Sequence, residues 1–248
     1  MATRRIERFL WSALALLGAA VGQAAPALQP FLATYNVEWR GLSAGTSTLE
    51  LVQQEGNTYT YRSRNAARGI FRIALPGTIT QTSTFDLVDG RVVPRRYSAD
   101  DGTRSTERDV ELEFDWNAGR ITGVSEEKPV DLPLEPGTLD ALSVQIALMS
   151  ALQSGSSPSS FRLVDDGEIK EYIYTREGTE TLKTPLGTHE TVIYSSHREG
   201  SSRVTRFWID PELGYLPVRA EQRRRGKVEF TMTLRALERS AAASTARN

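Results

Sequence analysis

The sequence predicts a mainly β protein: a curled antiparallel sheet, or an incompletely closed β-barrel, of about a dozen strands with one internal helix. Apolar and polar residues alternate with a period of two through most of the chain from Phe31 onward, as in strands with one buried face. Turn-forming pairs such as Asp-Gly interrupt the alternation at hairpin-length intervals. Only one stretch, at about residues 138–153, repeats its apolar residues at helical spacing.

The composition sets broad limits on function. The chain has 248 residues, no cysteine and a formal net charge of −1. This length is sufficient for one large β domain with a sizeable core. The absence of cysteine excludes disulfides, thiol nucleophiles, cysteine metal sites and a lipid-modified N-terminal cysteine. The near-neutral charge gives no electrostatic reason to expect nucleic acid as a partner.

The N-terminus has the layout of a cleaved secretory signal. The basic segment Met1–Arg8 precedes an apolar run, Phe9–Ala20, and the small residues Gly22 and Ala24 suit a cleavage site. The apolar run is shorter than the roughly 20 residues that span a bilayer. An uncleaved N-terminal anchor is the alternative. We therefore expect an exported, periplasmic protein, cleaved after Ala24 or nearby and without a transmembrane span after cleavage.

Three segments follow from this pattern: a signal peptide at residues 1–24, a single β-rich domain at 25–239, and a disordered tail at 240–248 that is polar and rich in alanine. A division into two β halves at residues 126–160 is the alternative to one domain, because that stretch interrupts the strand pattern.

Strands dominate the first half of the domain. In the first of them, Tyr35 and Trp39 share the apolar face. Asp89-Gly90 is the strongest hairpin signal, because both residues tolerate the positive φ of a tight hairpin turn. The alternation predicts strands at residues 31–40, 46–54, 58–65, 78–88, 91–99, 106–116 and 120–125.

The middle of the domain changes character. Glu126–Gly137 contains three prolines and no period, which predicts a loop. Thr138 is expected to cap a helix that runs to Gln153, with Asp140 in its first turn. Its apolar stripe, which includes Ile146, is expected to pack against the sheet.

Strands resume at Phe161 and continue to about Ala236. Four pairs are predicted as hairpin turns: Asp166-Gly167, Glu177-Gly178, Glu199-Gly200 and Arg225-Gly226. Asp210–Pro217 is predicted to be a stiff corner, with Pro217 near the start of a strand.

One predicted strand carries a carboxylate at every second position. A calcium site is the functional interpretation, since Ca²⁺ takes six to eight oxygen ligands. Same-face neighbours along a strand lie about 6.5–7 Å apart, which favours a solvated face opposite Arg91, Arg95 and Arg96 of the preceding strand. The acidic positions are Glu107, Asp109, Glu111, Glu113 and Asp115.

The two histidines, His189 and His197, lie eight residues apart in one predicted strand. A straight strand would separate them by roughly 26 Å, so they are not expected to share a metal. The ordinary interpretation places both on the surface. Residue order leaves a Ser/His/Asp hydrolase open. Gly41–Gly45 has the Gly-x-Ser-x-Gly spacing, but it lies between two predicted strands and not at the strand-to-helix turn that a nucleophile elbow requires. We therefore expect no enzymatic activity, no catalytic residue, no metal site and no cofactor.

Aromatic residues recur on the predicted strands. They form either a packed core or the lining of an apolar pocket inside an open barrel, and the ligand-binding residues stay unknown. The basic run Arg223–Lys227 is interpreted as a solvated hairpin tip, with a contact to anionic lipid headgroups as the alternative. The aromatic positions are Tyr35, Trp39, Tyr59, Tyr61, Phe85, Trp116, Tyr172, Tyr174, Trp208 and Tyr215.

Four short motifs resemble the pattern of a bacterial exported family that is designated domain of unknown function 3108. They are Tyr35-x-Val37-x-Trp39-x-Gly41, Thr184–Thr188, Arg206–Asp210 and Leu213–Val218. The resemblance covers most of residues 30–238 and implies an envelope-associated β-rich protein with no assigned reaction. The architecture is more distantly similar to the periplasmic lipoprotein-carrier fold, a likeness that transfers no residues.

Together these observations predict a non-enzymatic periplasmic protein that binds an apolar or amphipathic, lipid-like envelope ligand. An envelope protein-interaction or assembly module is the alternative. A hydrolase is the third hypothesis, and it requires a Ser or Asp beside His189 or His197 in a cleft. The sequence leaves open whether the helix fills the sheet interior, and it does not identify the ligand, the partner or the oligomeric state.

Overall fold

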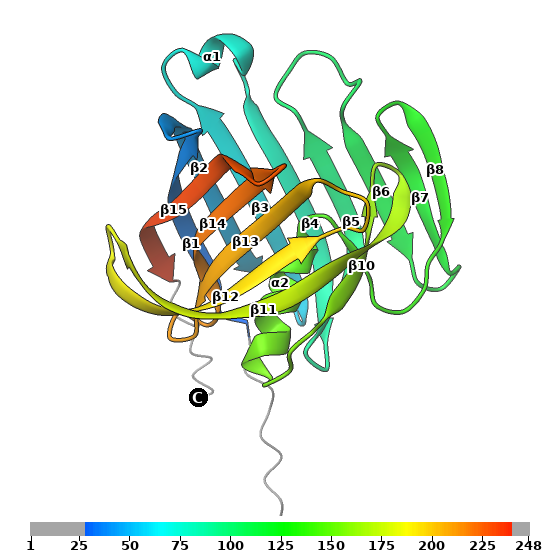
Figure 1. Cartoon of the computed structure of the whole chain (residues 1–248). Helices are drawn as coiled ribbons and strands as arrows, with labels where there is room; N and C mark the ends of the chain where they lie inside the picture. Colours follow the sequence, from blue (N-terminus) through cyan, green and yellow to red (C-terminus); the bar gives the residue numbers. More distant parts are fainter. Residues whose placement is uncertain (1–27, 240–248) are drawn as a thin grey trace, which may run out of the picture.

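The computed structural model describes residues 28–239; the predicted signal peptide and the predicted tail at 240–248 lie outside the described residues. Within this range the chain forms one sheet of fifteen strands together with two helices (Figure 1). The sheet is antiparallel apart from the parallel pair β9–β10. The predicted fold class, mainly β with an open curled sheet, is confirmed, although the strands are more numerous than the expected dozen or so.

The elements follow one another in chain order as β1 (Phe31–Trp39), β2 (Leu42–Gln53), β3 (Thr58–Ala67), α1 (Phe71–Ala74), β4 (Thr78–Val88), β5 (Arg91–Asp100), β6 (Val110–Asp115), β7 (Arg120–Ser125), β8 (Lys128–Pro133), β9 (Thr138–Asp140), α2 (Ser143–Gln153), β10 (Ser160–Asp165), β11 (Glu168–Thr184), β12 (Gly187–His197), β13 (Arg203–Asp210), β14 (Leu216–Arg224) and β15 (Lys227–Arg239).

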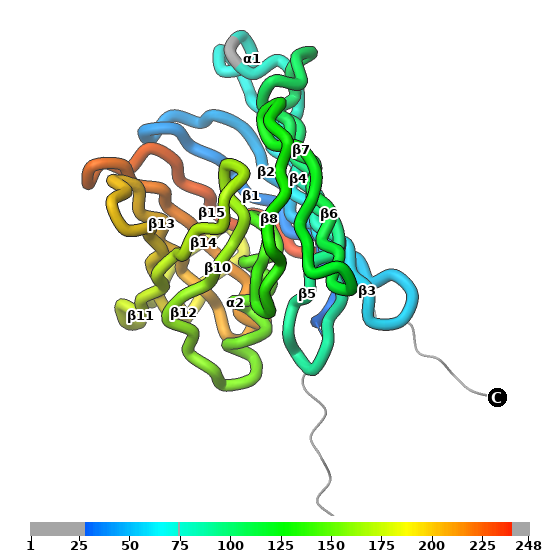
Figure 2. Tube along the Cα trace, turned by 90° about the vertical axis from the view of Figure 1, so that its right-hand side faces the viewer, coloured from blue at the N-terminus to red at the C-terminus, as the bar shows by residue number. Residues whose placement is uncertain are grey.

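The first and last strands of the described chain lie at the middle of the sheet. β1 pairs with β2 on one side and with β15 on the other. This pairing joins an N-terminal wing, β1–β8, to a C-terminal wing, β9–β15, and leaves β8 and β9 as the two edges. The wings curl toward each other with α2 between them (Figure 2), and β9 lies against β5.

Two-residue turns set the register of several hairpins. Asp89 and Gly90 have φ of 50° and 75°, and Arg225 and Gly226 have φ of 49° and 77°. These are the positive angles that the sequence pattern predicts at both turns. Glu177-Gly178 was expected to be a turn too, and this prediction is wrong. β11 continues through it with a register shift between Arg176 and Gly178, because a glycine within a strand accommodates a β-bulge.

The loop predicted at residues 126–137 contains strand β8, which the sequence pattern missed. β8 pairs only with β7 and forms one edge of the sheet. An edge strand needs ladder hydrogen bonds on one side only, so it tolerates Pro129 and Pro133, which have no N–H to donate. The prolines that suggested a loop are therefore compatible with this position.

The predicted helix is present but begins five residues later than expected, at Ser143 instead of Thr138. Thr138–Asp140 forms β9, which pairs in parallel with Arg162–Val164 of β10. The side chain of Asp140 accepts the N–H groups of Leu142 (2.9 Å) and Ser143 (2.7 Å), so Asp140, and not Thr138, binds the backbone where the helix begins. Long-range pairing thus shortens the helix at its N-terminus.

Helix α2 occupies the space between the two wings. Its buried side chains include Ile146 and Met149, which pack in the main core, and Leu148 and Leu152, which pack on the C-terminal wing. The helix therefore fills much of the interior that the sequence left open, and ligand space has to lie beside it.

A hydrogen bond also joins the two wings directly. The hydroxyl of Tyr35 in β1 donates it over 2.8 Å to the carbonyl oxygen of Pro217 in β14.

Candidate functional site

A cleft beside α2, here called the α2 cleft, has a volume of about 620 Å³. It lies where the β4–β5 hairpin tip and β10 approach the exposed side of the helix. The serine hydroxyl of Ser150 fixes this arrangement by donating a 2.6 Å hydrogen bond to the carbonyl oxygen of Gly90. The lining residues are Asp89, Gly90, Arg91, Val92, Pro136, Gly137, Leu139, Ala147, Ala151, Ser154, Ser156, Ser160, Phe161, Arg162 and Glu171.

The α2 cleft combines apolar and charged groups. Apolar surface comes from the strands and from Ala147 and Ala151, which lie four residues apart on one face of α2. Charged groups come from Asp89, Arg91, Arg162 and Glu171. Arg162 is already engaged with the carboxylate of Glu135, whereas Arg91 is exposed. The lining therefore offers both apolar surface and charged groups of either sign.

The second cleft, of about 440 Å³, lies beside the corner that joins β13 to β14. Met149 and Gln153 of α2 face Pro211–Tyr215 across it, and Gln153 donates a 2.8 Å hydrogen bond to the carbonyl oxygen of Gly214. Tyr215 has a φ of 60°, and Gly214 a φ of 67°. This is the predicted stiff corner, and Pro217 lies in the second position of β14, as expected.

His189 is buried, with 8% of its surface exposed, so the predicted surface position is wrong for this residue. Its Nδ1 lies 2.7 Å from Oδ2 of Asp210, and its Nε2 lies 2.9 Å from Oγ1 of Thr184. The three residues come from β12, β13 and β11, which pair side by side. Residue spacing could not reveal this contact, because it depends on the pairing of three strands. His197 lies half-buried at the other end of β12.

The order Thr184, His189, Asp210 matches that of a nucleophile, a base and an orienting acid. Two observations oppose catalysis. The Thr184 hydroxyl accepts the N–H of Leu186 at 3.1 Å, which ties it into the β11–β12 turn. None of the three residues lines either cleft. The geometry is that of a buried polar contact across three strands, apart from both clefts described above.

The acidic strand residues have the structural role that their spacing suggests. Glu113 lies opposite Arg96 and forms a 2.7 Å ion pair with it, as the solvated-face interpretation predicts. The expected pairing is wrong for Arg95, which binds Asp86 on β4. Asp115 accepts the N–H groups of the turn that follows β6.

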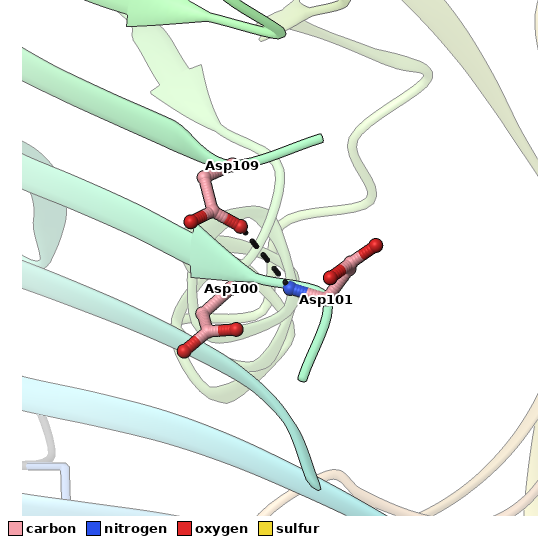
Figure 3. A group of neighbouring side chains, drawn as sticks. All are labelled: Asp100, Asp101 and Asp109. Carbon is pink, nitrogen blue, oxygen red and sulfur yellow. Dashed lines mark hydrogen bonds between the residues drawn. The ribbon is translucent and has the colours of Figure 1, made fainter. Parts of the chain in front are cut away.

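One acidic position does contribute to a cluster. Asp109 meets Asp100 and Asp101, two residues that the sequence did not single out, with carboxylate oxygens within 4.8 Å of one another (Figure 3). Each carboxylate accepts a backbone N–H in the loop between β5 and β6: Asp100 that of Gly102, Asp101 that of Thr103 and Asp109 that of Asp101. Hydrogen bonds from Thr103 lower the pKa of Asp101. The cluster is accounted for by these turns.

Asp140 is fully buried where β9 meets α2. Besides the two helix N–H groups, its carboxylate accepts a 2.6 Å hydrogen bond from the hydroxyl of Ser83 in β4. Burial raises the pKa of Asp140, and the hydrogen bonds from Ser83, Ser143 and Leu142 oppose that shift. Asp140 therefore fixes the start of α2 to the N-terminal wing and so shapes the α2 cleft indirectly.

The comparison with protein families gives one decisive match. The model of a protein family of unknown function, DUF3108, matches residues 34–234. The chain belongs to this family. The match spans all four motifs on which the resemblance was recognised, and the family carries no assigned activity. The comparison with curated proteins gives no match.

Two solved structures are similar to this DUF3108 protein, and the first of them supports the fold. A β-barrel-like protein of the domain of unknown function DUF1849 from Brucella abortus is 14% identical, with a TM-score of 0.56 over 86% of this chain and 99% of its own. A protein with a YmcC-like fold from Bacteroides fragilis is 13% identical, with a TM-score of 0.38 over 86% of this chain and 97% of its own. At these identities the first likeness concerns the architecture alone.

Proposed function

We propose that this DUF3108 protein binds an amphipathic, lipid-like molecule of the bacterial envelope and catalyses no reaction on it. The observation that carries the proposal is the α2 cleft. Its volume of about 620 Å³ falls within the range of roughly 300–1,000 Å³ that is common for small-molecule sites. Its mixture of apolar and charged lining matches a ligand with both kinds of surface.

The site differs from the hollow barrel considered from the sequence. Because α2 fills the interior, the ligand is expected to lie between the helix and the strands that flank it. Ala147 and Ala151 leave room on the helix face, and Phe161 supplies aromatic surface opposite them. Arg91 is the exposed cation that suits an anionic headgroup.

Export to the periplasm is part of the same proposal. It rests on the basic and apolar N-terminal segment, which lies outside the described residues. Neither helix within residues 28–239 is long and apolar enough to cross a membrane.

Cleft-filling variants test the proposal. Native mass spectrometry and lipid extraction of the protein purified from the periplasm should reveal a bound amphiphile. The double substitution Ala147→Phe and Ala151→Phe should reduce its occupancy at least tenfold, because the new rings occupy the cleft. Arg91→Gln should weaken retention of anionic ligands selectively.

Ala141→Phe is the matched control, since Ala141 is exposed just before α2 and does not line the cleft. Circular dichroism must show the same folded spectrum for all variants. The proposal fails if no amphiphile co-purifies, or if the double variant retains it at the wild-type level.

The alternative, a protein-interaction or assembly module, was expected to act through exposed sheet edges. One edge, β8, combines Pro129 and Pro133 with the exposed charges of Lys128 and Asp131. Prolines and charges are features that discourage the addition of another strand. We therefore rank this alternative second. Crosslinking in cells that recovers one defined protein through β8 would reverse the ranking.

A further inference from the structure

The loop between β3 and β4, residues 68–76, exposes large apolar side chains. This segment, here called the α1 loop, contains helix α1. Ile70 is 74% exposed, Ile73 is 87% exposed and Leu75 is 41% exposed. Soluble proteins rarely gather exposed apolar residues of this size on one short segment without a binding partner.

The α1 loop is held in place from beneath. Phe71 packs edge-on against Trp39 of β1, with ring centroids 5.8 Å apart. The N–H of Arg68 donates a 2.7 Å hydrogen bond to the carbonyl oxygen of Ala44 in β2. These contacts direct one aromatic ring toward the sheet and leave Ile70 and Ile73 facing outward. Figures 1 and 2 place the loop at one end of the sheet, beyond the strand ends.

The other end of the loop makes a close backbone contact. A Cβ atom at Gly77 would lie 1.8 Å from the carbonyl oxygen of Gly102, so only glycine permits this approach. The loop is therefore tied to the sheet at Arg68 and to the β5–β6 loop at Gly77. Its exposed isoleucines are presented by a defined segment of the fold.

Within the chain segment that contains the α1 loop, the charged residues all have the same sign. Residues 56–85 contain no aspartate or glutamate but include Arg62, Arg64, Arg68 and Arg72. Arg62 pairs with Glu50, whereas the other three arginines are exposed and form no ion pair among residues 28–239. Arginines beside exposed apolar side chains are complementary to a layered surface. The arginines can contact anionic groups at its outside, and the apolar side chains can enter an apolar layer beneath them.

Neighbouring segments extend this surface. Leu42 is 57% exposed, and it lies opposite Trp39 in the β1–β2 pair. Phe230 is 43% exposed and lies opposite Trp39 on the β15 side. The β14–β15 hairpin tip, three residues from Phe230, adds the exposed cations Arg224, Arg225 and Lys227. The adjoining β5–β6 loop carries both signs of charge, so the cationic surface runs from the α1 loop toward β15.

We propose that the α1 loop docks on the surface of an anionic phospholipid bilayer. Ile70 and Ile73 enter the boundary between headgroups and acyl chains, while Arg68 and Arg72 contact lipid phosphates. This is how short amphipathic elements bind an interface without spanning it. A lipid surface fits better than a protein partner, because a stable protein interface buries about 800 Å² per partner on a broad complementary face. The α1 loop is a narrow protrusion.

Vesicle co-sedimentation tests the docking. The full chain is expressed for export, and the purified protein is mixed with vesicles of phosphatidylcholine alone or with phosphatidylglycerol. The wild type should bind the anionic vesicles preferentially and lose binding as salt increases. Ile70→Ser with Ile73→Ser should weaken binding at least tenfold. Arg68→Gln with Arg72→Gln should weaken it roughly fivefold per arginine on anionic vesicles only.

Matched controls separate docking from general effects. Val52→Ser changes an exposed valine near the far end of β2 from Leu42, and Arg235→Gln changes an exposed arginine in the distal half of β15. Both should bind vesicles like the wild type. So should Ala147→Phe with Ala151→Phe, which separates docking from ligand binding in the α2 cleft.

A second readout locates the contact. Because Trp39 touches Phe71, brominated lipids should quench its fluorescence on docking, and Trp39→Phe should remove that component of quenching. The proposal is overturned if the wild type does not bind anionic vesicles, or if the isoleucine pair can be replaced without loss. Binding of a defined protein by the same residues, with no vesicle binding, would also overturn it.

Discussion

The two helices within residues 28–239 place similar residues in opposite environments. Ile146 of α2 is fully buried between the wings, whereas Ile73 of α1 is 87% exposed. Both lie near the middle of an apolar segment, but α2 is enclosed by sheet on either side and α1 extends past the strand ends. The comparison shows that similar apolar segments attached to a curled sheet can be buried or exposed. The outcome depends on whether the neighbouring strands extend far enough to cover the segment.

The largest expected effect concerns the buried isoleucine. Ile146→Ala should lower the free energy of unfolding by about 2–5 kcal/mol, because it removes buried methyl groups and leaves a cavity. Ile73→Ala should change it by less than about 0.5 kcal/mol, as for other surface substitutions. Urea unfolding followed by circular dichroism measures both. Equal effects for the two variants would contradict the contrast between the helices.

A smaller effect is expected at the start of α2. Asp140→Ala removes the acceptor for Ser83, Leu142 and Ser143, and it should cost about 1–3 kcal/mol of unfolding free energy, because buried donors lose their partner. Asp140→Asn keeps one carbonyl oxygen and should cost less. The same urea titration compares the two variants. An Asp140→Ala variant with the unfolding free energy of the wild type would show that α2 does not depend on these hydrogen bonds.

The smallest effect is a pH dependence at the same residue. The pKa of Asp140 is raised in the folded protein, mainly by burial, above its ordinary value of about 3.9. The folded state therefore binds this proton more tightly than the unfolded state does. As pH falls through the raised pKa, Asp140 protonates and the burial penalty on its charge disappears, so its contribution to stability increases. That contribution is lost again as pH rises.

Unfolding measured from pH 7 to pH 4 checks this sign. The difference in unfolding free energy between wild type and Asp140→Asn should shift in favour of the wild type as pH falls. A difference that stays constant, or that shifts the other way, would mean that the carboxyl group is not penalised by its burial.

The strand pattern and most turns could be predicted from the sequence, because both are local properties. Alternation reflects one buried face, and pairs such as Asp89-Gly90 are read from the two residues themselves. The α2 cleft could not be predicted. Its lining joins the β4–β5 tip, α2 and β10, and no sequence spacing specifies that these elements meet. Only one residue of the acidic cluster was identified from the sequence. Asp109 belongs to the alternating carboxylates, whereas Asp100 and Asp101 do not.

By itself, the sequence determined the β class, the family motifs, most of the hairpin turns and the presence of a helix that ends at Gln153. Tertiary structure decided where that helix begins, since β9 pairs with β10 and withdraws Thr138–Asp140 from it. It also decided the burial of His189 beside Asp210 and the exposure of Ile70 and Ile73. In each case, the outcome depends on residues distant in the chain, whereas local patterns report only what a segment does with its immediate neighbours.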